Sequence, residues 1–419
     1  MMKLSPILAA LTCTFSLASQ AQVPVTPENG YAVGTEVPLP EPYATKSAKR
    51  RSEVIQWPDD KKPSVPEGFT VKVFAKDLQH PRWIYTLPND DVLIAESNDA
   101  ESGSADRITL FRDKDKDGVA EERHVFLEKG LNQPFGMALL QGDFYVANTD
   151  SIVRYKYEDG ANSIKGEGKK IHTLPSGGYN HHWTRNIKVN EAGDKFLLTV
   201  GSSSNVGEHG MDKEERRAKI LTVNPDGSNE EIFAWGLRNP NGLDYNPVTG
   251  ELWTAVNERD KLGDNLVPDF VTSVKEGGFY GWPYKYYGEN IDPRWSDNMP
   301  KDLPEKTLIP DMALGSHTST MDLEFYEGDA FPERYHNGLF AAQHGSWNRA
   351  KYNGYRIVFM PFENGKPTGE IESFMDGFLK DMKSDTAYGR PSAVRETASG
   401  MLLVADDDGN TIWSVQADK

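Results

Sequence analysis

The sequence predicts an all-β protein, a six-bladed β-propeller. The first observation is a strand–turn–strand pattern that recurs six times along the 419 residues. The second is the weak helix signal beyond residue 67, where alternating segments such as 69–74 and 355–359 dominate. The third is the supply of turn residues, 37 Gly and 26 Pro. A radial array of blades explains the recurrence and leaves few exposed sheet edges, which favours it over the alternative of two β-sandwiches.

The first 21 residues are expected to be a cleaved signal peptide. Lys3 is followed by an apolar run from Pro6 to Ala18 and by the cleavage tripeptide Ser19-Gln20-Ala21. The alternative, a membrane anchor, needs about 20 apolar residues, which is longer than this run. The signal predicts a periplasmic or secreted protein that does not span the membrane.

Cysteine usage excludes several kinds of site. The one cysteine, Cys13, lies inside the signal peptide and has a poor lipoprotein context. The mature chain therefore has no disulfide, no thiolate zinc site and no covalently attached c-type haem. The net charge of −17 also argues against a nucleic-acid partner. Residues 22–66, rich in proline, are expected to be an extended lead-in that packs around the propeller domain of residues 67–419.

Each repeat is expected to supply the two inner strands of one blade. The repeats begin at His80, Gln133, His182, Asn239, His317 and Arg390. The outer strands come from intervening segments such as 107–112 and 219–224. Because innermost propeller strands begin at one mouth of the central channel, side chains at the repeat starts should converge there. They are Arg82, Gln133, His182, Arg185, Arg238, Asn239, His317 and Arg390. Such a basic set in an acidic protein predicts a pocket for an anionic ligand.

Three stretches carry a resemblance to a known family. They are residues 177–186 (GGYNHHWTRN), 236–242 (GLRNPNG) and 343–349 (QHGSWNR), supported by 280–283, 354–356 and 389–391. Over residues 67–417 the sequence resembles the L-sorbosone dehydrogenase branch of the soluble sugar dehydrogenases that depend on pyrroloquinoline quinone (PQQ). The resemblance implies a six-bladed propeller that oxidises a sugar, or a sugar-derived aldehyde or alcohol, by hydride transfer to the quinone. It also implies an external electron acceptor.

The resemblance implies specific roles for residues at the channel mouth. His182 would be the general base, and Arg238 would stabilise the charge that develops on the quinone oxygen. The cofactor-binding set would be Arg185, Arg238, Asn239, His317, Arg349 and Arg390, with Arg349 replacing a lysine that is absent at 343–345. His181 and His182, if extended, would point to opposite sides, so that only one faces the channel. Arg185 has an alternative role as the partner of a carboxylate between blades.

Two calcium sites are predicted. By resemblance, backbone carbonyls of Asn257, Glu258 and Arg259 would hold an ion near the quinone, although the Glu258-Arg259 pair departs from the family's usual Gly-Pro. Independently, Asp113, Asp115, Asp117 and Glu121 begin like a calcium-binding loop. His124 at its twelfth position rules out a complete EF-hand, and an acidic hairpin tip that binds only water is the alternative.

Two other functions compete with the dehydrogenase. A calcium-dependent lactonase or esterase would need several acidic side chains at the channel mouth, where the repeats instead present Arg and His. A non-catalytic propeller that binds a partner is the third possibility, because fold does not fix function.

Overall fold

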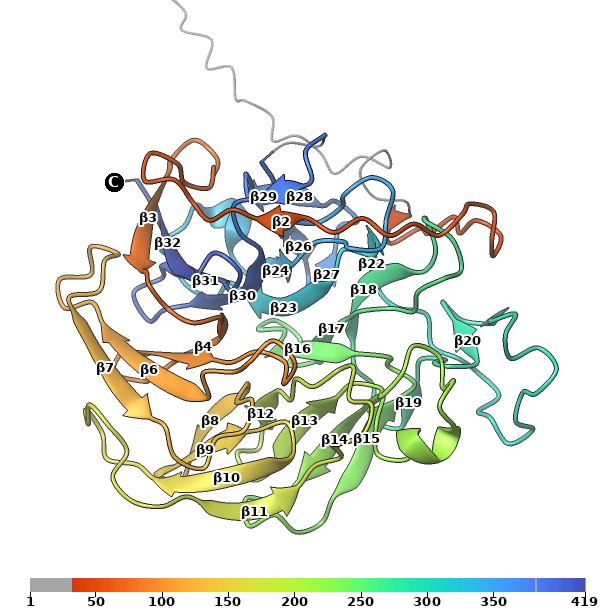
Figure 1. Cartoon of the computed structure of the whole chain (residues 1–419), viewed down its shortest axis with the longest axis horizontal. Helices are drawn as coiled ribbons and strands as arrows, with labels where there is room; N and C mark the ends of the chain where they lie inside the picture. The colour runs from red at the N-terminus through yellow and green to blue at the C-terminus, as the bar shows by residue number, and fades with distance from the viewer. Residues whose placement is uncertain (1–31, 381–382, 419) are drawn as a thin grey trace, which may run out of the picture.

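The fold consists of six sheets arranged as blades around a central channel, antiparallel except where β19 joins the third in parallel (Figure 1). The computed structural model describes residues 32–380 and 383–418, so the predicted signal peptide lies outside the described residues. No α-helix occurs in these ranges, which contain only the 3₁₀ turns η1 (Met211–Glu214) and η2 (Glu333–Tyr335). The predicted all-β six-bladed propeller is confirmed.

The first three blades follow the chain in order. Blade 1 contains β4 (Pro81–Thr86), β5 (Val92–Glu96), β6 (Arg107–Arg112) and β7 (Glu122–Leu127). Blade 2 contains β8 (Met137–Leu140), β9 (Asp143–Ala147), β10 (Ser151–Lys156) and β11 (Lys169–Thr173). Blade 3 contains β12 (Ile187–Val189), β13 (Phe196–Val200), β14 (Lys219–Val223) and β15 (Glu231–Trp235), with β19 (Gly278–Phe279) added at its outer edge.

The later blades carry the longer insertions. Blade 4 contains β16 (Pro240–Tyr245), β17 (Leu252–Val256), β18 (Pro268–Ser273) and β22 (Met312–Ser316). Its insertion includes the hairpin of β20 (Lys285–Tyr286) and β21 (Asn290–Ile291). Blade 5 contains β23 (Thr320–Phe325), β24 (Leu339–Gln343), β25 (Arg356–Met360) and β28 (Glu372–Met375), and the hairpin of β26 (Phe362–Glu363) and β27 (Lys366–Pro367) follows β25.

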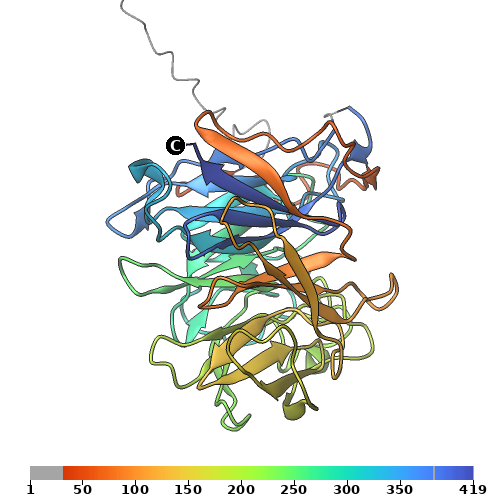
Figure 2. The ribbon, with the colours of Figure 1, turned by 90° about the vertical axis from the view of Figure 1, so that its left-hand side faces the viewer.

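The ring is closed by pairing the two ends of the propeller. Blade 6 contains β30 (Pro391–Glu396), β31 (Leu402–Asp406) and β32 (Thr411–Ala417), and its outermost strand is β3 (Phe69–Ala75) from the other end of the chain. The antiparallel register runs from Phe69 opposite Ala417 to Ala75 opposite Ile412. Figure 2 shows the orange β3 beside the dark blue β32.

Residues 32–66 run along the outside of blades 4 to 6. Strand β1 (Val33–Gly34) pairs with β22, and β2 (Glu53–Val54) pairs with β29 (Thr386–Ala387) (Figure 1). The Trp57 ring then packs edge-on against Phe378 and Trp413, with ring centroids 5.5 and 5.1 Å apart. The segment therefore adds apolar contact to the closing blade.

The hydrophobic core lies between neighbouring blades. Second strands such as β5 and β13 are buried along their whole length, since both faces meet another blade. Strands buried on both faces read as continuous apolar runs, as in Val92-Leu93-Ile94-Ala95. This packing fixes the inner strands, so the loops at their ends are held in defined positions around the channel.

Candidate active site

A cavity opens at the channel mouth where the innermost strands begin. Its lining comes from blades 1, 3, 4 and 5 and mixes basic, acidic, amide and aromatic side chains. The lining residues include Arg82, His181, His182, Arg238, Asn239, Asn257, Glu258, Asp260, Asp269, His317, His344, Trp347 and Asn348. Of the predicted set, His182, Arg238, Asn239, His317, Asn257 and Glu258 meet here.

His182 is held as a neutral base. Its Nδ1 lies 2.8 Å from the carbonyl oxygen of Ser202 and 3.0 Å from the Ser202 hydroxyl. That hydroxyl donates its own proton to the Ser204 carbonyl at 2.6 Å, so it can only accept from the ring. The proton of the neutral ring is therefore on Nδ1, and Nε2 carries the lone pair. No described residue forms a hydrogen bond with Nε2.

The surroundings of His182 favour this neutral form. Burial lowers the pKa of the imidazole well below its usual value, and the nearby positive charge of Arg238 lowers it further. The ring therefore stays uncharged at neutral pH and can accept a proton at Nε2.

The expectation that His181 and His182 point to opposite sides is wrong. Both side chains line the cavity, and their ring centroids lie only 4.8 Å apart at 67°. The reason is local geometry, because β12 begins at Ile187 and the histidine pair precedes it in a bend. His181 is the exposed member of the pair and stacks parallel to Tyr179 at 5.7 Å.

Arg238 is fixed beside His182 by a loop of blade 3. Its Nε donates to the Asn205 carbonyl at 3.1 Å, and its Nη2 donates to the Asn205 side chain at 3.0 Å. The same guanidinium forms an ion pair with Asp260 at 3.2 Å. With both ends held, Arg238 presents a fixed positive charge to the cavity, the arrangement suited to an anionic oxygen.

Asn239 brings an unsatisfied acceptor to the cavity. Its side-chain Oδ1 is buried and has no hydrogen-bond partner among the described residues. The site depends on Gly201 at this point, because a Cβ there would lie 2.2 Å from this oxygen and 2.6 Å from the His182 Cβ. An orphaned buried acceptor in a cavity wall is typical of a ligand-binding position.

The structure places three of the predicted cofactor arginines elsewhere. Arg185 is fully buried and donates to the carbonyls of His182, Thr184 and Pro175, which also excludes the carboxylate partner considered for it. Arg349 donates to the carbonyl of Asp264 and the side chain of Asn265. Arg390 donates to the carbonyls of His344 and Gly345. These guanidinium groups shape the loops around the cavity, and the sequence motif alone did not distinguish that role from ligand binding.

His317 lies opposite, in the loop before blade 5. It is almost fully buried, and its Nδ1 lies 3.6 Å from Asp260 and 3.3 Å from the Asn348 amide. Burial lowers its pKa, so it too is neutral near pH 7. Its Nε2 lies 3.3 Å from the Gly263 carbonyl oxygen, so both ring nitrogens have partners within the protein.

The three residues predicted to bind calcium through their backbone carbonyls differ in their positions relative to the cavity. Asn257 and Glu258 border the cavity, whereas the Arg259 side chain is completely buried behind them in ion pairs with Glu258 and Asp292. Asp269 lies beside this turn and accepts the backbone N–H of Glu258 at 2.8 Å. Burial raises the pKa of Asp269 to about 7. Carbonyl and carboxylate oxygens thus meet here, the ligand types that calcium prefers.

The expectation that the mouth lacks acidic side chains is also wrong. Glu258, Asp260 and Asp269 all border the cavity. They lie after β17 and within β18 of blade 4, so they reach the mouth from the second and third strands, not from the repeat starts. The repeat pattern therefore does not predict them.

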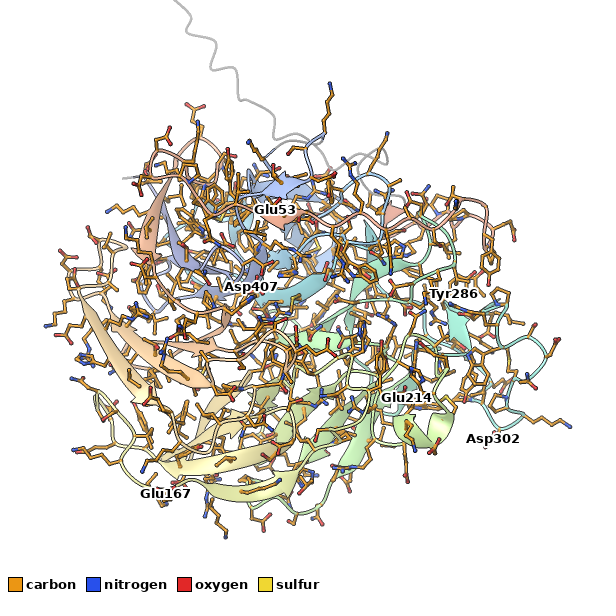
Figure 3. All side chains as sticks on the ribbon, in the orientation of Figure 1. Glu53, Glu167, Glu214, Tyr286, Asp302 and Asp407 are labelled. Atoms are coloured by element: carbon orange, nitrogen blue, oxygen red, sulfur yellow. The ribbon has the colours of Figure 1, made fainter. Side chains whose placement is uncertain are left out.

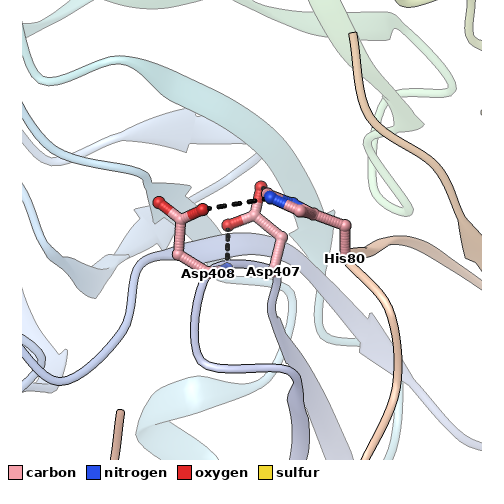
Figure 4. A group of neighbouring side chains, drawn as sticks. All are labelled: His80, Asp407 and Asp408. Carbon is pink, nitrogen blue, oxygen red and sulfur yellow. Dashed lines mark hydrogen bonds and ion pairs between the residues drawn. The ribbon is translucent and has the colours of Figure 1, made fainter. Parts of the chain in front are cut away.

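A second group missed by the sequence centres on Asp407. This fully buried carboxylate follows β31 and lies near the centre of the ring (Figure 3). It forms an ion pair with Arg82 and a 2.8 Å hydrogen bond with Nε2 of His344, and His80 contacts both Asp407 and Asp408, at 3.8 and 3.3 Å (Figure 4). His344 lines the cavity, and burial lowers its pKa to about 4. The motif at 343–345 contained this histidine, but its partner Asp407 lies 63 residues away.

The four acidic side chains of the blade 1 loop lie close together, as the sequence predicted. Side-chain oxygens of Asp113, Asp115, Asp117 and Glu121 lie within 4.8 Å of one another in the β6–β7 connection. Burial raises the pKa of Asp113, and the Glu121 charge raises it further. This loop is separate from the channel mouth.

Two further observations bear on what the chain is. No helix in residues 32–380 or 383–418 is long and apolar enough to cross a membrane.

Among solved structures, the PQQ domain of pyranose dehydrogenase from Coprinopsis cinerea, in its holo form, superposes with a TM-score of 0.68 at 18% identity, covering 85% of this chain and 97% of that domain. The calcium structure of the family AA12 enzyme from Trichoderma reesei gives 0.71 at 17% identity, covering 87% and 98%. At these identities the likeness concerns the fold.

Comparison of amino-acid sequences identifies relatives and a family. An uncharacterized protein of Borreliella burgdorferi is 31% identical over 372 residues, 85% of this chain and 91% of that protein. A pyrroloquinoline quinone-dependent sugar dehydrogenase of Hypocrea jecorina is 22% identical over 360 residues, 74% of this chain and 78% of its own length. The profile of the TrAA12-like family matches residues 63–274 and 296–418, nearly the whole propeller. The chain belongs to the TrAA12-like family.

Proposed function

We propose that this protein is a PQQ- and calcium-dependent dehydrogenase that oxidises a sugar, or a sugar-derived aldehyde or alcohol. The observation that carries the proposal is the neutral His182, with its proton fixed on Nδ1 and its Nε2 lone pair free beside the Arg238 guanidinium. A free base next to a fixed positive charge suits removal of a hydroxyl proton while a second group gains negative charge. The resemblance to the sorbosone branch supports a sorbosone-type or aldose-type substrate.

The residues of the cavity fit the quinone. Its carboxylates need cationic partners, which Arg82 and Arg238 supply at the wall. Asn239 offers an acceptor that no protein donor satisfies. The backbone carbonyl oxygens of Asn257 and Glu258 offer ligands for a hard cation at the same cavity. Arg185, Arg349 and Arg390 would act indirectly, through the loops that they anchor.

In the proposed reaction, each residue of the cavity would have a distinct role. When bound, the quinone would supply a hydride acceptor and the calcium ion a Lewis acid. His182 takes the substrate hydroxyl proton at Nε2, while Ser202 keeps the ring oriented through Nδ1. Arg238 stabilises the negative charge that develops in the cavity. His317 and Asn348, which hydrogen-bond to each other, shape another part of the same cavity wall.

Partners beyond the substrate follow from the same proposal. The proposed reaction would require an external electron acceptor. The four clustered carboxyl groups of the β6–β7 loop would bind a second, structural calcium ion, distant from the chemistry. Export from the cytoplasm belongs to this proposal as well.

A calcium-dependent lactonase is the second candidate, favoured by one observation. Glu258, Asp260 and Asp269 supply acidic groups at the mouth that could hold an ion and its water. Against it, Glu258 is already paired with Arg259, and Asp260 with Arg238.

One experiment separates the candidates. Purified protein is loaded with calcium and PQQ, and an absorption change of the bound quinone is followed with dye reduction over a panel of aldoses, sugar aldehydes and alcohols. Substrate-dependent dye reduction that requires quinone supports the dehydrogenase. Lactone hydrolysis with calcium but without quinone supports the lactonase. Neither activity leaves a non-catalytic binding module.

A further inference from the structure

A buried carboxylate lies behind the loop that orients His182. Glu214 ends the short turn η1 and is only 2% exposed (Figure 3). Glu214 lies outside the sequence motifs described above and does not line the cavity. Burying a carboxyl group is costly unless its oxygens are hydrogen-bonded, so the partners of Glu214 indicate its structural role.

All four donors to the Glu214 carboxylate come from two neighbouring serines. Ser203 donates through its backbone N–H at 2.8 Å and its hydroxyl at 2.7 Å. Ser204 donates through its backbone N–H at 3.1 Å and its hydroxyl at 2.7 Å. No ion pair to a Lys or Arg side chain supplements these bonds within the described residues. The carboxylate is thus devoted to this one loop.

The loop leads directly to the base. Ser202 precedes the two serines, accepts the Nδ1 proton of His182 with its carbonyl and hydroxyl, and donates to the Ser204 carbonyl. The carbonyl oxygen and the hydroxyl of Ser202, which accept the Nδ1 proton of His182, therefore belong to a loop that Glu214 holds in place. A second contact fixes the other side, where the Ser202 N–H donates to the Arg238 carbonyl at 2.7 Å.

We propose that Glu214 is a positioning residue for His182: by binding Ser203 and Ser204 it holds Ser202 where it keeps the imidazole proton on Nδ1. The statement that this serves catalysis rests on the proposed function, whereas the effect on the tautomer does not. A carboxamide has one acceptor oxygen, and its NH₂ group would face the serine donors. Glu214→Gln should therefore loosen this loop while leaving the cavity wall intact.

The test begins with the protein free of quinone. Histidine labelled with ¹⁵N reports the tautomer directly, and the spectrum of His182→Ala assigns the signal among the nine histidines. In the parent protein we expect protonated Nδ1 and bare Nε2 at pH 7. In Glu214→Gln we expect a mixture of tautomers, with a pKa that moves up toward the usual value because the loosened site admits water.

Activity of the loaded protein gives a second measure. We expect kcat of Glu214→Gln to fall by about tenfold to a hundredfold, with KM nearly unchanged, and the acid limb of its pH profile to move upward. The matched control is Asp91→Asn, which removes an equally buried carboxylate that binds Arg112 in blade 1. It should lower thermal stability but leave the tautomer and the pH profile unchanged.

Two outcomes overturn the proposal. One is a Glu214→Gln protein that folds and keeps the parent tautomer and pH profile. The other is an Asp91→Asn protein that changes both as much as Glu214→Gln does. If Glu214→Gln does not fold, Ser204→Ala decides, since it deletes one of the four donors and should shift the tautomer in the same direction; an unshifted tautomer refutes the inference. A shifted tautomer without any dehydrogenase activity refutes the proposed function alone.

Discussion

Adding one methyl group at Gly201 should disable the base without removing any catalytic atom. The new Cβ would lie 2.6 Å from the His182 Cβ, where ordinary contact begins at 3.4 Å, a shortfall of 3.4 − 2.6 = 0.8 Å. The Asn239 side chain on the other side is 2.2 Å away but can rotate, so the backbone of His182 must absorb most of the strain. A displacement near 1 Å costs about 10²-fold in turnover, and overpacking costs about 1–3 kcal/mol in the free energy of unfolding.

The assay compares kcat from dye reduction with thermal unfolding for Gly201→Ala and a control. Gly338→Ala is the control, because its Cβ would meet the Phe359 ring at 2.4 Å in the outer part of blade 5. Both variants should lose comparable stability, and only Gly201→Ala should lose turnover. A folded Gly201→Ala protein with kcat within threefold of the parent would refute the assignment of His182 as the base.

Further predictions concern the base, the metal, the pH dependence of stability and the mature N-terminus. His182→Ala should fold, retain quinone and lose about 10²–10⁴-fold in turnover, whereas Arg238→Ala should weaken both quinone retention and turnover; loss of activity in His181→Ala instead would transfer the role to that residue. Because the pKa of His182 is lowered, parent activity should persist well below pH 6.5 and fall only as the pH drops through that pKa. Exhaustive chelation should abolish quinone-dependent activity and calcium should restore it, so full activity in verified metal-free protein would contradict the calcium site. Burial raises the pKa of Glu396 to about 7, so the folded state binds its proton more tightly and stability declines as the pH rises through 7. Glu396→Gln should therefore narrow the difference in Tm between pH 5 and pH 8, and an unchanged difference would contradict this. Mass spectrometry of the mature protein should find Gln22 at its N-terminus, and an intact N-terminus would refute export by this signal.

The fold was predictable because a propeller repeats one local pattern. Each inner strand pair is a hairpin of adjacent segments, so the alternation around 80–97 or 391–406 is visible without knowledge of distant contacts. His182, Arg238 and Asn239 were predictable for the same reason, since they begin repeats.

The rest of the site depends on contacts between distant segments. Arg185 and Arg390 occupy repeat starts as expected, yet carbonyls of neighbouring loops capture their guanidinium groups. Asp407 joins His344 across a blade boundary, and Asp269 reaches the mouth from a third strand. A residue's type and place in the repeat predict which mouth it approaches, whereas loop packing decides whether it faces the ligand or the protein.

The pairing of β3 with β32 has a consequence for the order of folding during synthesis. The outermost strand of blade 6, β3, is synthesised before the blades, and its partner β32 is synthesised after them. β3 therefore stays unpaired while more than 300 residues are translated. Until the final strand emerges, the nascent chain carries an open ring with two unprotected edges, a state prone to pairing with other chains. A chain truncated before Thr411 would remain in that state permanently, and a cell that produces this protein must keep β3 from pairing with other chains until β32 has been translated.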